Sequence, residues 1–207
     1  QQQGAAGGRV LVLCQPGLDF IAGFFGCLYA GAVAVPVHPS VREHLVGRVA
    51  SIVADVQPDF ALTTAESQAK IRTTVDGLVE GRPLRWCLTD TVVGDGQEWV
   101  APGIDASATA MVQYTSGSTS SPKGVVLTHG NLIHNLEAIR QTWHGNDHAI
   151  GVFWLPPYHD MGLIGGILDT LYVGGTSHLM SPTTFIKHPM RWLEALSRYR
   201  ATIPTAP

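Results

Sequence analysis

The sequence predicts an α/β fold in which mostly parallel sheets are flanked by helices. Short β-branched or apolar segments alternate with segments whose apolar residues recur at the three- and four-residue spacing of a helix. The 207 residues are 45% hydrophobic and 14% charged, so the chain can bury a substantial core. Such alternation favours helices on both faces of a parallel sheet, with functional loops at the carboxyl ends of the strands.

The first half of the chain predicts four strands separated by three helices. The strands are expected at residues 9–14, 32–35, 59–63 and 84–88. Asp19 is a candidate cap for the first helix, and Thr64 is a candidate cap for the third. Ser40 and Glu43 have the spacing of a capping box, which predicts the start of the second helix.

Residues 89–109 form the predicted linker or sub-lobe boundary, because they are rich in Gly, Asp and Pro. The linker separates a first α/β lobe at residues 1–88 from a second α/β lobe at residues 110–207. In the second lobe, the expected elements are strands at residues 110–114, 124–128 and 150–155, a helix at residues 132–143 and a final helix after Pro189.

The composition argues against several classes of partner. The net charge is -3 and the basic residues are scattered, so no basic surface is expected to neutralise the phosphates of a nucleic acid. Residues 20–41 carry no Asp, Glu, Lys or Arg, but glycines and prolines interrupt them, which favours a buried helix and strand over a membrane span. Residues 1–8 lack the basic start and the apolar stretch of a secretory signal. The three cysteines lie in apolar segments, which is typical of buried thiols and predicts a cytoplasmic protein.

Residues 113–124, QYTSGSTSSPKG, predict a phosphate-binding loop between two strands. Glycines allow backbone N–H groups to approach an anion, Ser and Thr add hydroxyl donors, and Lys123 adds a positive charge. The loop is not a Walker motif, because Lys123 precedes Gly124 and the following residues predict a strand rather than a helix. By composition alone, the alternative is an ordinary solvated loop.

Residues 154–166, WLPPYHDMGLIGG, place His159 and Asp160 directly after a predicted strand and before an apolar helix. Ligand-binding residues of α/β proteins often occupy this position. The alternative is that Asp160 caps the helix and His159 packs beneath it. The apolar helix, with Leu163 and Leu168, could line an acyl tunnel or simply pack in the core.

Both segments resemble sequences of the adenylate-forming superfamily, which includes acyl-CoA synthetases, nonribosomal peptide adenylation domains, luciferases and fatty acyl-AMP ligases. Residues 114–124 are similar to the signature loop of that superfamily. Residues 155–165, LPPYHDMGLIG, resemble the fatty acyl-AMP ligases in particular. Residues 28–39 are similar to the early core motif of the family, and residues 180–193 resemble the fatty acyl-AMP ligase stretch that follows the histidine motif. Ser120 stands where the family usually has glycine, so a less flexible loop or slower turnover is expected.

The resemblance implies the large N-terminal domain of an enzyme that activates a fatty acid with ATP and Mg2+. In the implied reaction the fatty carboxylate attacks the α-phosphorus of ATP, which gives acyl-AMP and pyrophosphate. The implied ATP-binding residues are Thr115, Ser116, Gly117, Ser118, Thr119, Lys123 and Gly124. Lys123 would also compensate the charge of the departing pyrophosphate, and His159 would place the carboxylate and the adenylate.

The implied partners are a long-chain fatty acid and an acyl carrier protein or polyketide synthase as the acyl acceptor. The family's magnesium ligand, ribose-binding aspartate and mobile C-terminal lysine are expected after Pro207, so no metal ligand is assigned and the chain alone is expected to be incomplete for catalysis. Two alternatives stay open, a fatty acyl-CoA synthetase and a catalytically silent domain that binds nucleotide or acyl groups.

Overall fold

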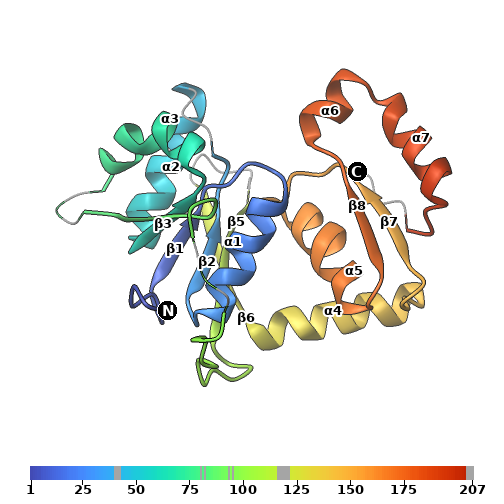
Figure 1. The fold of residues 1–207 in the computed structure, drawn as a ribbon, viewed down its shortest axis with the longest axis horizontal. Helices are drawn as coiled ribbons and strands as arrows, with labels where there is room; N and C mark the ends of the chain where they lie inside the picture. The colour runs from blue at the N-terminus through green and yellow to red at the C-terminus, as the bar shows by residue number, and fades with distance from the viewer. Residues whose placement is uncertain are drawn as a thin grey trace. The chain divides into compact units, whose positions relative to one another are not determined.

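The computed structural model describes residues 1–39, 43–79, 81, 83–92, 94, 96–115 and 122–203. The chain divides into two compact units, Gln1–His129 and Gly130–Pro207. Each unit contains its own sheet, and the order of the elements along the chain can be followed by colour in Figure 1.

The first unit is built on a six-stranded sheet with the order β4-β3-β1-β2-β5-β6. Its strands are β1 (Arg9–Val12), β2 (Val33–Pro36), β3 (Phe60–Thr63), β4 (Arg85–Leu88), β5 (Thr109–Thr115) and β6 (Lys123–Thr128). Every neighbouring pair from β4 to β5 is parallel, whereas β6 runs antiparallel to β5. The predicted α/β fold with a mostly parallel sheet is therefore confirmed.

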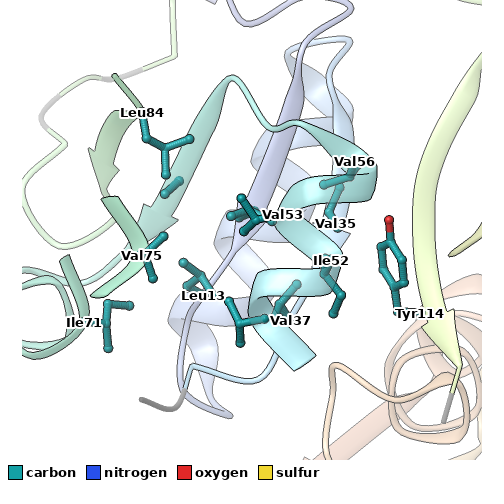
Figure 2. Close-up of a cluster of buried hydrophobic side chains, with 13 residues drawn as sticks. Leu13, Val35, Val37, Ile52, Val53, Val56, Ile71, Val75, Leu84 and Tyr114 are labelled. Carbon is teal, nitrogen blue, oxygen red and sulfur yellow. The ribbon is translucent and has the colours of Figure 1, made fainter. Parts of the chain in front are cut away.

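Helices α1 (Leu18–Tyr29), α2 (Glu43–Val56) and α3 (Ala65–Asp76) connect the first four strands. The side chains of α2 and α3 form a buried cluster with one face of the sheet, including Leu13, which directly follows β1, and Ala61 of β3 (Figure 2). Helix α1 covers the other face, because a Cβ added at Gly23 would lie 2.4 Å from Leu62, whose side chain alternates with that of Ala61. The missing side chain at Gly23 thus lets α1 approach Leu62 closely.

The predicted helix caps have three different outcomes. Thr64 is the N-cap of α3, and its hydroxyl accepts a hydrogen bond from the backbone N–H of Ser67, as predicted. The predicted cap at Asp19 is wrong, because α1 begins at Leu18. Its N-cap is Gly17, which makes no side-chain capping hydrogen bond. Asp19 instead lies in the first turn, where its carboxylate faces the positive end of the helix dipole. Ser40 of the predicted capping box lies outside the described residues.

The two compact units divide at His129, whereas the sequence places the boundary at residues 89–109. Strand β5 follows that segment but pairs in parallel with β2, with Ala34 opposite Met111, and β6 then pairs with β5. Both strands therefore belong to the sheet of the first unit. The partner of a strand is a long-range property, so a local composition change does not mark the boundary of a sheet.

The second unit contains a parallel pair of strands, β7 (Ile150–Phe153) and β8 (Thr176–Leu179). Its helical elements are α4 (His129–Trp143), the π-helix η1 (Met161–Leu168), α5 (Asp169–Tyr172), α6 (Pro182–Lys187) and α7 (Met190–Tyr199). Within this unit Phe153, Leu163 and Ile167 are buried. The sequence predicts α4, β7, the helix after Asp160 and α7, but not β8 or α6.

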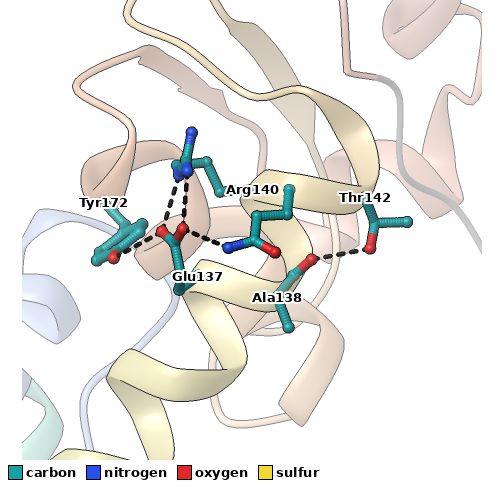
Figure 3. A network of polar contacts seen from close by, with 6 residues as sticks. Glu137, Ala138, Arg140, Thr142 and Tyr172 are labelled. Atoms are coloured by element: carbon teal, nitrogen blue, oxygen red, sulfur yellow. Dashed lines mark hydrogen bonds and ion pairs between the residues drawn. The ribbon is translucent and has the colours of Figure 1, made fainter.

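A polar network on Glu137 joins α4 to the end of α5 (Figure 3). The Glu137 carboxylate accepts hydrogen bonds from Arg140 and Gln141 on α4 and from the Tyr172 hydroxyl, 3.0 Å away. The hydrogen bonds from Arg140, then those from Gln141 and Tyr172, lower the pKa of Glu137 to about 2. The carboxylate thus stays ionised and holds Tyr172 against α4.

Among the described residues, no helix has both the length and the apolar character that crossing a membrane requires. The uncharged segment at residues 20–41 instead contains most of α1, which has 12 residues, and β2, which has four. This arrangement is the buried helix and strand that the glycines and prolines predict.

Candidate active site

The first candidate segment is the connection between β5 and β6. These strands pair in antiparallel register up to Thr115 opposite Lys123, with Tyr114 opposite Gly124 one step earlier. Thr115 and Lys123 are both exposed at the end of the pair. Of the predicted phosphate-binding residues, Thr115, Lys123 and Gly124 are described, whereas Ser116, Gly117, Ser118 and Thr119 lie outside the described residues, as does Ser120. The strand that follows the loop is the one predicted, which separates the loop from a Walker motif.

Tyr114 anchors the end of β5 in the core of the first unit. Its side chain is only 7% exposed and belongs to the cluster formed by α2 and α3 (Figure 2). The phenol hydroxyl donates a 2.5 Å hydrogen bond to Oδ2 of Asp55 on α2. Burial, together with this carboxylate, raises the pKa of the Tyr114 phenol, so the hydroxyl remains a donor at neutral pH.

Gly124 is required by packing against Tyr114. A Cβ at this position would lie 3.0 Å from Cζ and 3.1 Å from Cε1 of the Tyr114 ring, and 3.0 Å from Cγ1 of Val112. Both neighbours belong to β5, the strand that pairs with Gly124. The lack of a side chain at Gly124 thus leaves room for the ring that fixes the start of the loop.

Arg48 on α2 fixes the backbone at the same point. Its Nη2 donates to the carbonyl oxygens of Tyr114 and Thr115, each at 3.3 Å. The sequence reasoning missed Arg48 and Asp55, since a helix that shows apolar periodicity gives no signal that its polar residues contact a loop. Their spacing of seven residues, about two helical turns, was the available signal that they share a face of α2.

The second candidate segment follows β7 in the second unit. The His159 side chain is 57% exposed, and its Nδ1 lies 2.5 Å from Oδ1 of Asp160. The same Asp160 oxygen accepts a 2.7 Å hydrogen bond from the backbone N–H of Met161 and so caps η1. The capping alternative is therefore correct for Asp160, but His159 does not pack beneath the helix. Its imidazole is oriented by Asp160 and remains accessible.

Gly162 and the aromatic residues around β7 hold this segment in place. A Cβ at Gly162 would lie 2.0 Å from the carbonyl oxygen of Pro156, so no other residue fits this turn. Trp154 stacks on Phe185 of α6 with ring centroids 3.8 Å apart, and Trp192 of α7 donates to the Val152 carbonyl. The chain that presents His159 is thus supported by α6 and α7.

The apolar helix behind His159 packs in the core of its unit. Leu163 is fully buried and Leu168 is 7% exposed. Of the two readings of this helix, core packing is the one that these exposures support. Helix η1 has the π form, in which the wider turn is frequently found at functional sites.

Within the described ranges, no three His, Cys, Asp or Glu side chains gather in a way that could hold a metal ion. The described residues therefore supply no ligand set for the magnesium ion that the resemblance implies.

The chain belongs to the AMP-binding enzyme family, whose model matches residues 1–207. The resemblance to fatty acyl-AMP ligases is likewise confirmed by the relatives. The chain is 40% identical over 204 residues to the medium-chain-fatty-acid–[acyl-carrier-protein] ligase JamA of Moorena producens, covering 96% of this chain and 34% of the relative. It is 36% identical over 199 residues to the long-chain-fatty-acid–AMP ligase FadD32 of Mycobacterium marinum, covering 96% of this chain and 32% of the relative.

Solved structures agree. The fatty acid AMP ligase of Legionella pneumophila matches with a TM-score of 0.89 at 39% identity, covering 98% of this chain and 35% of that chain. A second structure of an L. pneumophila fatty acyl-adenylate ligase, in complex with acyl adenylate and pyrophosphate, matches with a TM-score of 0.88 at 38% identity, covering 98% of this chain and 35% of that chain. The chain thus spans about a third of the length of the relatives that it matches.

Proposed function

We propose that the complete protein activates a fatty acid as its acyl-AMP, with release of pyrophosphate. The observation that carries this proposal is the match to fatty acyl-AMP ligases along almost the whole chain. The paired strands β5 and β6, which flank the first candidate segment, and the exposed His159 side chain before η1 support it. The preferred substrate is a long-chain fatty acid, which the relative FadD32 of M. marinum is named for using.

In the proposed step, a carboxylate oxygen forms a bond to the α-phosphorus of ATP while the bond from that phosphorus to the bridging oxygen breaks. The electron pair of the broken bond leaves with pyrophosphate. Catalysis of this kind consists mostly of positioning and charge stabilisation. Magnesium would neutralise part of the polyphosphate charge when it is bound.

The first segment would bind the phosphates, and the second would place the carboxylate and the adenylate. Thr115, with Ser116, Gly117, Ser118, Thr119 and Gly124, would bind the β- and γ-phosphates. Lys123 is exposed at the first residue of β6, where its ammonium group can approach the departing pyrophosphate. His159 would place the carboxylate and the adenylate, since its imidazole is accessible and is oriented by Asp160.

We further propose a carrier protein as the acyl acceptor and the cytoplasm as the location. Support for a carrier comes from JamA, which is named as an acyl-carrier-protein ligase. The cytoplasmic assignment is supported by three free cysteines, of which Cys14 and Cys27 are buried. Burial raises the pKa of both thiols to about 12, so they are inert at neutral pH.

The experiment that tests the proposal uses the complete protein with ATP labelled at the α-phosphate and fatty acids of graded chain length. Acyl-AMP formed in a one-to-one ratio with pyrophosphate, and only in the presence of a fatty acid, is the expected result. Addition of coenzyme A separates the synthetase alternative, because a synthetase would convert the acyl-AMP to acyl-CoA. Nucleotide binding without any acyl-AMP would contradict the proposal.

A further inference from the structure

Two polar side chains of α2 contact Tyr114, the second-last residue of β5. Arg48 and Asp55 are seven residues apart, about two helical turns, so both project from the face of α2 that meets β5. Arg48 donates to the carbonyl oxygens of Tyr114 and Thr115, and Asp55 accepts the Tyr114 hydroxyl. The same tyrosine is thus held at its backbone by one side chain and at the tip of its ring by the other.

The packing between these two contacts is tight. Ile52 lies one turn from Arg48 on the same face of α2, is 2% exposed, and belongs to the same buried cluster as Tyr114 (Figure 2). A methyl group at Gly124 would lie 3.0 Å from Cζ of the same ring, so it would fit only if the ring or Val112 shifted by a few tenths of an ångström. Because protein cores are close-packed, the ring can move only if one of these neighbours moves.

We propose that Arg48 and Asp55 are positioning residues that set the backbone direction at Thr115 and, through the strand pair, at Lys123. This inference rests on the proposed function, since it assigns to α2 the placement of the phosphate-binding segment. The Arg48 guanidinium carries five N–H donors in a planar fork, and its Nη2 contacts two successive carbonyls at the end of β5. A lysine offers a single flexible ammonium group and can reproduce only part of this arrangement.

The residues that flank the loop need such an anchor for a physical reason. Among the described residues, Thr115 and Lys123 form the last pair in the register of β5 and β6, so the direction of the chain at this pair sets where both flanks of the loop start. A misplacement of about 1 Å at reacting groups can cost about 10²-fold in rate. The contact from Arg48 on α2 to the carbonyl oxygens of the last two residues of β5 limits such a shift.

The first test compares Arg48→Ala and Arg48→Lys with the unaltered complete protein in the fatty-acid-dependent exchange of ATP and pyrophosphate. Arg48→Ala is expected to lower the exchange rate about 10²-fold and to raise KM for ATP, while KM for the fatty acid stays constant. Arg48→Lys should recover part of the loss. Arg72→Ala is the matched control, because Arg72 forms an exposed ion pair with Asp76 on α3 of the same unit. A merely structural role would lower the amount of folded enzyme and leave both KM values unchanged.

The second test measures the anchor without catalysis, by hydrogen–deuterium exchange of the peptide covering residues 109–128 in the absence of substrates. Exchange should accelerate in Arg48→Ala and in Asp55→Ala, but not in Arg72→Ala. Asp55→Asn should stay close to the unaltered protein because it retains an acceptor for the Tyr114 hydroxyl. Since Asp55 and Tyr114 act as one contact, the effects of Asp55→Ala and Tyr114→Phe should not add in the double variant.

The two tests separate the inference from the proposed function. If the unaltered protein showed no exchange of ATP and pyrophosphate, the proposed function would fail and the amide exchange would still decide whether α2 anchors the segment. If Arg48→Ala left both the amide exchange at residues 109–128 and KM for ATP unchanged, the inference would be overturned while the proposed function stood. Should Arg48→Ala not fold, Arg48→Lys and Asp55→Ala provide the same comparison.

Discussion

The packing of Gly124 against Tyr114 predicts that Gly124→Ala destabilises the protein. The added methyl group would lie 3.0 Å from Cζ of Tyr114 and 3.0 Å from Cγ1 of Val112, and the ring cannot turn away freely because it is 7% exposed and bonded to Asp55. Overpacking of this kind costs about 1–3 kcal/mol. Against it stands a gain of about 0.4–1 kcal/mol, because alanine restricts the unfolded chain more than glycine does. The midpoints of the two ranges give a net loss of about 1.3 kcal/mol.

Gly26→Ala is the matched control for this substitution. Gly26 lies on α1 in the same unit, is exposed, and has no atom within 4 Å of an added Cβ. Alanine there should stabilise the protein by roughly 0.5–1 kcal/mol. Both variants are compared by thermal and denaturant unfolding, in which a loss of 1 kcal/mol corresponds to a melting temperature lower by about 2–8 °C. A Gly124→Ala protein as stable as Gly26→Ala would refute the packing argument.

Three further predictions concern the two candidate segments and the polar network. Lys123→Ala should raise the activation free energy of adenylate formation by about 2.7–4 kcal/mol, the effect of one lost transition-state donor, and should change fatty-acid binding little. An unaltered exchange of ATP and pyrophosphate would show that Lys123 does not belong to the site. His159→Ala should slow adenylation with ATP affinity nearly intact, and His159→Phe should be milder; weaker ATP binding at a normal maximal rate would contradict a positioning role. Because the folded protein lowers the pKa of Glu137 to about 2 from an ordinary 4.5, its contribution to stability is present above pH 4.5 and is lost as the pH falls towards 2. Glu137→Gln should therefore flatten the stability profile in that range, and an unchanged acid profile would exclude the network as its cause.

Local patterns were sufficient to predict most elements of the fold, because amphipathic periodicity reflects which face of an element is buried. The strands and helices of the first unit follow the predicted order, and the cap at Thr64 is present. Strand β8 was missed since its sequence, TSHL, is short and mostly polar, and α6 was missed because it has only six residues. The π form of η1 is also invisible in the spacing of its apolar residues, because its sequence MGLIGGIL is apolar at every position that is not glycine.

The strands that lead into the two candidate segments were predictable from the sequence. The connection between β5 and β6 and the turn at His159 both follow strands, as the sequence indicates. The supports of these segments were not predictable, because Arg48 and Asp55 are 66 and 59 residues away from Tyr114 along the chain. The need for glycine at Gly124 also depends partly on residues distant in sequence, because the Tyr114 ring that it contacts is held by α2 as well as by the two strands.

The central claim is tested most directly by incubating the complete protein with a long-chain fatty acid and ATP labelled at the α-phosphate, and then resolving acyl-AMP from AMP. The claim predicts label in acyl-AMP with an equal amount of pyrophosphate, and no detectable acyl-AMP from residues 1–207 alone, because the groups that act together in catalysis are expected to include residues after Pro207. Release of AMP or ADP without acyl-AMP from the complete protein would contradict fatty acid adenylation. Acyl-AMP from residues 1–207 at the rate of the complete protein would contradict the placement of essential residues after Pro207.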